Sequence, residues 1–169
     1  MPARNRIPLR NLIFVAFMED VTGGQVFLRS DWPLHITLAR FDAGAPAGAD
    51  PAAPVAAAVD APARAALGAA LRIGEDAGFG RDGSVRVSLV EPHPALQTLH
   101  EETVRAVTDL GGRILTPHHT LSGYRPHISH RGAARPSPGD AVVLDRIALV
   151  DMAPDGDRTV RRILHLWRL

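Results

Sequence analysis

Residues 32–38 read W-P-L-H-I-T-L, and residues 124–130 read Y-R-P-H-I-S-H. Each stretch contains a histidine, an isoleucine and a hydroxyl residue in that order, at positions 35–37 in the first and 127–129 in the second. On a β-strand this spacing places the imidazole and the hydroxyl on one side, about 6–7 Å apart, and the isoleucine on the other. The repeat therefore predicts two strands that each present an imidazole beside a hydroxyl.

Two such units facing each other across a cleft would supply what phosphoryl transfer without a metal requires. One imidazole takes a proton from the attacking water or hydroxyl, and the other gives a proton to the leaving oxygen. Histidine suits both roles, because its unperturbed pKa of about 6.5 allows either form near neutral pH. We therefore predict His35 and His127 as the catalytic pair, with Thr37 and Ser129 holding the phosphate oxygens.

The rest of the chain favours an α+β fold with a mainly antiparallel sheet. Apolar runs or alternation predict strands at 12–18, 35–41, 85–89 and around Ile128, and a closing hairpin from 142–150 and 160–169. Pro92 and Pro94 open the best helix, which Gly111-Gly112 ends. Its predicted buried face contains Leu96, Leu99, Thr103, Ala106, Val107 and Leu110.

One connection is the least structured part of the prediction. Residues 43–63 consist mostly of Ala, Gly, Pro and Asp, so we expect a flexible segment there, with Asp60 as the N-cap of a short helix over 64–71. Otherwise residues 1–169 are expected to form a single domain with two lobes.

Composition limits the classes of function. The chain has no cysteine, which excludes disulfides, thiolate metal sites and cysteine nucleophiles. The net charge is +1 with neutral histidines, and no basic block indicates a long nucleic acid as partner. No apolar run is long enough to span a membrane, and no signal peptide is evident, so we expect a cytoplasmic protein. Walker, Rossmann and nucleophile-elbow motifs are missing from the sequence.

With these flanks and this order of elements, the paired His-x-Thr/Ser motifs resemble those of the two-histidine (2H) phosphoesterase superfamily. That superfamily includes 2′-5′ RNA ligases and 2′,3′-cyclic phosphodiesterases. The resemblance covers most of the chain, from residue 12 to 169. It implies a bilobal fold with two pseudo-symmetric antiparallel sheets, helices on the outer faces and a central cleft. It also implies that the enzyme needs no cofactor or metal. We therefore expect an enzyme of RNA processing that opens a 2′,3′-cyclic phosphate, or a related phosphodiester at a nucleotide or RNA end, and we expect a monomer.

A second candidate motif lies just before His127. His118 and Thr120 have the same His-x-Thr spacing. We prefer His127, because Pro126 biases Arg125 towards extended geometry and so favours the start of a strand. Tyr124, Arg125 and Arg131 are further candidates for contacts with the substrate, through stacking on a base or through phosphate oxygens.

Two other functions remain open from the sequence. The chain could be a nucleotide- or RNA-end-binding module without turnover. It could also be a metal-dependent hydrolase that uses the histidine-rich stretch 118–130, although a hydrolytic zinc site usually adds a third protein ligand and the sequence offers no clear candidate. Turnover of a cyclic nucleotide separates the first alternative from an enzyme, and an assay in chelator separates the second.

Overall fold

The structure is a computed structural model that describes residues 9–44 and 49–169. Strands precede, separate and follow two α-helices along it. In chain order they are β1 (Leu9–Phe17), β2 (Val26–Leu28), β3 (His35–Gly44), α1 (Ala52–Ala66), β4 (Ala70–Phe79), β5 (Val85–Val90), α2 (Pro94–Asp109), β6 (Arg113–Ile114), β7 (His127–Ser129), β8 (Ala141–Val143), β9 (Arg146–Asp151) and β10 (Val160–Arg168).

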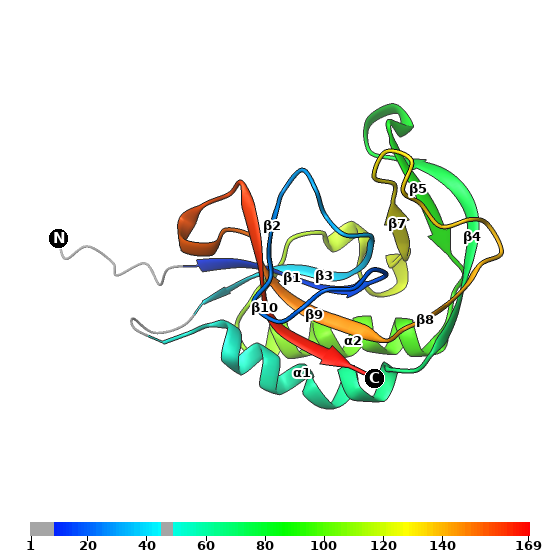
Figure 1. Cartoon of the computed structure of the whole chain (residues 1–169). Coiled ribbons are helices and arrows are strands. Elements are labelled where there is room, and N and C mark those ends of the chain that lie inside the picture. The colour runs from blue at the N-terminus through cyan, green and yellow to red at the C-terminus, as the bar shows by residue number, and fades with distance from the viewer. Residues whose placement is uncertain (1–8, 45–48) are drawn as a thin grey trace.

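All the described strands belong to one antiparallel sheet, in the order β2-β10-β9-β1-β3-β7-β5-β4-β8, with β6 beside β3. The sheet curls so strongly that its two halves rise on either side of β1 and β3 (Figure 1). The α+β prediction is confirmed. The two halves predicted as separate sheets are continuous with each other, because β3 of one half pairs with β7 of the other.

The junction between the halves is narrow and apolar. Its one ladder pair joins Ile36 of β3 to Ile128 of β7. The row continues outward to Ala16 of β1 and to Ser88 of β5. All four residues are fully buried, so each His-x-Thr/Ser unit is anchored by its central isoleucine, as the alternation predicts.

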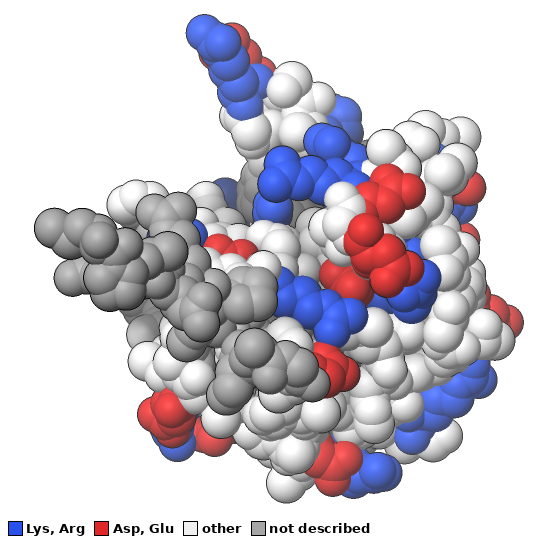
Figure 2. Space-filling model, turned by 90° about the vertical axis from the view of Figure 1, so that its left-hand side faces the viewer, with Lys and Arg blue, Asp and Glu red and all other residues white. Residues whose placement is uncertain are grey.

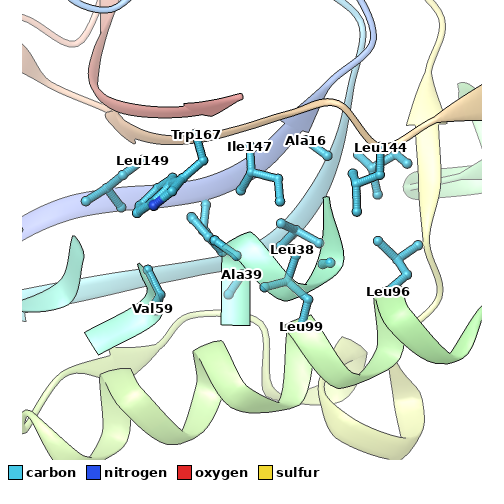
Figure 3. Packing of buried hydrophobic residues seen from close by; sticks show 14 of the residues in the cluster. Ala16, Leu38, Ala39, Val59, Leu96, Leu99, Leu144, Ile147, Leu149 and Trp167 are labelled. Carbon is cyan, nitrogen blue, oxygen red and sulfur yellow. The ribbon is translucent and has the colours of Figure 1, made fainter. Parts of the chain in front are cut away.

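Both helices lie together on one face of the sheet (Figure 1). Between them and the sheet lies the main core, where Trp167 and Leu149 meet Leu38 and Leu99 (Figure 3). The α2 helix begins at Pro94, and the His93 side chain caps it by accepting a hydrogen bond from the Ala95 amide at 3.1 Å. Of the predicted helix face, Leu96, Leu99, Thr103 and Val107 are buried and Ala106 is partly buried, whereas Leu110 follows the helix and is exposed.

The opposite face of β1, β9 and β10 carries a second, smaller apolar cluster. Val15 and Phe17 of β1 are fully buried there, beside Ile163 of β10. Phe27 and Trp32 pack against the edge of this cluster. Since His35 is the register partner of Phe17, this face is the one on which the first histidine unit lies.

The prediction for residues 43–63 is wrong over most of its length. The α1 helix already begins at Ala52, and its apolar stripe, which includes Val55 and Val59, is buried against the core. Asp60 lies inside the helix and is not its N-cap, and residues 70–79 form β4. Alanine has the highest helix propensity, and burial of the two valines adds the tertiary support that a low-complexity reading overlooks. Residues 45–48 of the segment lie outside the described residues. Neither described helix is long and apolar enough to cross a membrane.

Candidate active site

His35 and His127 are held in the same way. Each is the first residue of a strand, and each Nδ1 lies next to the carbonyl oxygen of the residue two positions earlier. The distances are 2.8 Å to Pro33 and 2.9 Å to Arg125. A carbonyl only accepts hydrogen bonds, so Nδ1 carries the proton in both rings. The Nε2 of each neutral imidazole is therefore left as the atom that can exchange a proton with a substrate.

The register of β3 and β7 brings the two units together. Because Ile36 pairs with Ile128, alternation places His35 opposite Ser129 and Thr37 opposite His127, all four on the other face of the sheet. Directly opposite residues have Cβ atoms about 4.5–5.5 Å apart, and diagonal neighbours about 7–8 Å. The two histidines are diagonal neighbours. The predicted set of two imidazoles and two hydroxyls thus lies on one patch of one face.

A cleft of about 280 Å³ opens beside this patch. Thr37 and His127 line it, together with Arg40, Tyr124 and Arg125. His35 and Ser129 stand next to it through the register but do not line it. His35, Thr37 and His127 are half-buried, and Ser129 is exposed. Thr37 and His127, one from each predicted unit, therefore line a space that a small ligand can enter.

The pKa of each imidazole is lowered from its ordinary value. Burial lowers the pKa of His35 to about 4, against the opposing effect of the Pro33 carbonyl, and the nearby His127 lowers it further. Burial also lowers the pKa of His127, with smaller contributions in the same direction from His119 and Arg125. The two rings are therefore close enough for the charge of one to disfavour the charge of the other.

Each imidazole also packs against an aromatic ring from its own half of the molecule. The His35 ring lies 4.4 Å from that of Trp32, and the His127 ring 4.4 Å from that of Phe79. The Arg125 guanidinium lies over the aromatic ring of the second pair, 5.1 Å from the Phe79 centroid. The sequence did not point to Phe79, which lies at the end of β4, because nothing in its neighbourhood indicates contact with a residue almost fifty positions later.

Tyr124 lines the cleft, but its hydroxyl is already engaged. It donates a hydrogen bond to the Thr37 carbonyl oxygen at 2.9 Å, and burial raises its pKa. Its ring stacks on the imidazole of His100, 3.9 Å away and nearly parallel. His100 Nδ1 in turn donates to the Leu38 carbonyl at 2.5 Å, and its Nε2 accepts from the Leu121 amide at 2.8 Å. Tyr124 and His100 thus support β3 beneath the site, a role that the sequence did not reveal for His100.

The two predicted arginines are placed differently. Arg125 is exposed and lines the cleft, so it remains able to reach a ligand. Arg131 is occupied by the protein itself. Its Nη1 donates to the Trp32 carbonyl at 2.7 Å, and its guanidinium pairs with the Glu19 carboxylate at 3.2 Å. Arg131 therefore ties the segment after β7 to the segment before β3.

The competing motif does not form a matching unit. His118 and His119 belong to a single 3-10 turn, and Thr120 donates its hydroxyl hydrogen bond to the Thr116 carbonyl. His119 and Thr120 line the cleft, whereas His118 does not. Within residues 9–44 and 49–169, no three His, Cys, Asp or Glu side chains are grouped to hold a metal ion.

No protein-family model and no curated protein matches this sequence significantly. Solved structures do. A crystal structure described as a phosphoesterase is 16% identical, with a TM-score of 0.57 over 96% of this chain and 99% of that one. LigT of E. coli complexed with NADP+ is 16% identical, with a TM-score of 0.54 over 95% and 97%. TT0787 of Thermus thermophilus is 20% identical, with a TM-score of 0.53 over 94% and 97%.

These matches extend over nearly the whole of both chains, so they concern the complete arrangement of strands and helices and not a shared fragment. At this level of identity they establish the fold. The curled antiparallel sheet, with two α-helices together on one face, is the fold that this chain shares with the phosphoesterase, LigT and TT0787 structures.

Proposed function

We propose that the chain is a phosphoesterase that opens a 2′,3′-cyclic phosphate, or a related phosphodiester at a nucleotide or RNA end, with His35 and His127 as general base and general acid. The observation that carries this proposal is the Ile36–Ile128 pairing, which sets both His-x-Thr/Ser units side by side on one face. LigT of E. coli, which has the same fold, was crystallised with NADP+ and with 3′-AMP. Nucleotide ligands of that protein support a nucleotide substrate here.

In the proposed reaction, the Nε2 of one neutral histidine removes a proton from water, and the water oxygen attacks phosphorus. The bond from phosphorus to one ribose oxygen breaks, and the other histidine protonates that oxygen. Thr37 and Ser129 donate hydrogen bonds to the non-bridging oxygens as negative charge builds on them. The product is a nucleoside 2′- or 3′-phosphate, and the two histidines end with their protonation states exchanged.

We assign the two proposed roles from the surroundings of each ring, which the sequence alone left open. Burial disfavours the charged form of His35 strongly enough to hold its pKa at about 4, so His35 is the neutral base. His127 lines the cleft directly, where the negative charge of a bound phosphate raises the pKa of a neighbouring imidazole. His127 is therefore the group that is protonated in the substrate complex and serves as the acid.

Hydrolysis of nucleoside 2′,3′-cyclic phosphates by the purified chain, followed by chromatography in excess EDTA, tests the proposal. We expect conversion to the monophosphate at a rate that EDTA leaves unchanged, since every proposed proton transfer uses a side chain. Loss of turnover in EDTA, with recovery on adding zinc, would identify a metal-dependent hydrolase. Saturable binding without any turnover would identify a binding module. A monomeric, cytoplasmic protein remains the expectation from sequence.

A further inference from the structure

Arg161, on β10, is a buried arginine with an incomplete set of partners. Its side chain is 7% exposed. One end of the guanidinium is fixed, because Nη1 donates to the carbonyls of Met152 at 2.5 Å, Val160 at 3.0 Å and Arg158 at 3.1 Å. Its Nε is buried and has no hydrogen-bond partner in the described part of the chain. The guanidinium is thus held in place while part of its donor set is unused.

Arg161 forms no ion pair with a carboxylate of the described residues. Within residues 9–44 and 49–169, the exposed side chains of Arg29 and Arg40 form none either. The carboxylate that acts on Arg161 from nearby belongs to Asp151, and it is held by Arg10 at 2.7 Å. Burial and the positive charges of Arg29 and Arg40 lower the pKa of Arg161. Buried charges are normally paired, and Arg161 has no ion-pair partner within the described residues, so its surroundings in this cluster of three arginines favour an anionic ligand.

The cluster adjoins the candidate active site. The Arg161 guanidinium lies 5.8 Å from the centroid of the Trp32 ring, and that ring lies 4.4 Å from the ring of His35. Arg40 and Met152, whose carbonyl Arg161 binds, both line the cleft. On the face that Figure 2 shows, arginine side chains gather beside a hollow under the projecting part of the molecule. An anionic group bound by Arg161 would therefore belong to the same molecule that reaches His35 and His127.

We propose that Arg161, with Arg40, binds a second phosphate group of the same substrate whose cyclic phosphate reacts at His35 and His127. This proposal rests on the proposed function and specifies its substrate class. Arginine suits the role, because its planar fork donates two parallel hydrogen bonds to phosphate oxygens. The second phosphate is either the 5′-terminal phosphate of a mononucleotide or the internucleotide phosphate of a short RNA end.

Three substrates distinguish these sources: adenosine 2′,3′-cyclic phosphate, its 5′-phosphorylated form, and a diadenosine that ends in a cyclic phosphate. Wild-type kcat/KM should be at least about tenfold higher for one of the two substrates with a second phosphate than for adenosine 2′,3′-cyclic phosphate. One or two charge-assisted hydrogen bonds provide a difference of this size. A gain with the 5′-phosphorylated form identifies a terminal phosphate, and a gain with the dinucleotide alone identifies an internucleotide one. Arg161→Met should abolish the gain.

The matched control is Arg162→Gln, on the same strand but partly exposed and paired with Asp155, and it should change neither activity nor preference. The inference is overturned if the second phosphate does not raise kcat/KM in the wild type, or if it raises kcat/KM equally in Arg161→Met. Turnover of adenosine 2′,3′-cyclic phosphate in the same experiment would still uphold the proposed function. If Arg161→Met does not fold, the same comparison is made with Arg40→Gln, because the Arg40 side chain is exposed. A gain in kcat/KM that Arg40→Gln leaves unchanged then overturns the inference.

A wild type that hydrolyses none of the three substrates overturns the proposed function. The second phosphate site is then tested by calorimetric titration with adenosine 3′,5′-bisphosphate and with 3′-AMP. Tighter binding of the bisphosphate, by about tenfold, that disappears in Arg161→Met or Arg40→Gln supports the site. Equal affinity for the two ligands, or a difference that both variants retain, overturns it.

Discussion

His35 and His127 are oriented by the same pair of contacts, one polar and one aromatic. A backbone carbonyl fixes Nδ1 of each ring, and Trp32 or Phe79 supports its plane. The short motif predicted that each histidine lies beside a hydroxyl residue on one face of a strand, because strand alternation is a local property. The aromatic supports could not be predicted in the same way, since Phe79 reaches His127 only through the pairing of β4, β5 and β7.

Replacing either histidine by alanine should reduce kcat for a cyclic nucleotide by at least about a hundredfold, because a positioned general acid or base contributes about 10²–10⁴ in rate. Thr37→Ala and Ser129→Ala should cost less, since each removes one hydrogen-bond donor. Circular dichroism should show that the variants remain folded. His118→Ala is the decisive control. If it abolishes turnover while His127→Ala remains near wild type, the site lies at the earlier motif.

The pH dependence follows from the lowered pKa values. The base must be neutral and the acid protonated in the free enzyme for kcat/KM. His35 is neutral above about pH 4. The pKa of His127 lies below its ordinary value of about 6.5, so His127 loses its proton as the pH rises towards neutrality. The profile of kcat/KM should therefore be bell-shaped, with its maximum on the acidic side of neutrality and its acid limb near pH 4. A maximum above pH 7 would show that the imidazoles are not desolvated as described.

A substitution at Tyr124 distinguishes a structural role of this residue from a contact with the substrate. Tyr124→Phe leaves the ring on His100 but removes the donor to the Thr37 carbonyl. An unsatisfied buried acceptor costs about 1–3 kcal/mol, so urea denaturation should show a loss of stability of that order. KM should change little. A large rise in KM with unchanged stability would instead restore the role in substrate binding that the sequence suggested.

At the scale of elements, the strands and α2 could be predicted because their alternation, prolines and glycines are local signals. The α1 helix could not be placed correctly. Its alanines carry little hydrophobic signal, and Pro51, Pro54 and Pro62 resemble loop residues. What stabilises α1 is contact with α2 and with the sheet, through positions such as Val59, and those partners are distant in the sequence.

A glycine substitution tests the early start of α1. Ala57 is exposed within the helix, so Ala57→Gly should lower the free energy of unfolding by about 1 kcal/mol through helix propensity alone. Ala133 is exposed in a turn, and Ala133→Gly should stay within about 0.5 kcal/mol of wild type. Equal, negligible effects in urea denaturation would indicate that residues around 57 are unstructured after all.

The candidate site lies where two halves of one sheet meet. The Ile36–Ile128 pair and the link from Arg131 to Glu19 and Trp32 hold those halves together. The repeated motif predicted that the two units would meet, and a continuous sheet is how they do so. The arginine cluster around Arg161 could not be predicted from the sequence, because Arg29, Arg40 and Arg161 lie on three different segments that only the sheet brings together.

If His35 and His127 act on one phosphate, a crystal structure with inorganic phosphate, or with 3′-AMP, should show both of them in contact with it. We expect a phosphate between the Nε2 atoms of His35 and His127, at about 2.7–3.2 Å from each, with the hydroxyls of Thr37 and Ser129 donating to its oxygens. A phosphate bound at His118 and Thr120, or one that contacts only one of the two histidines while the other faces packed core, would contradict the account.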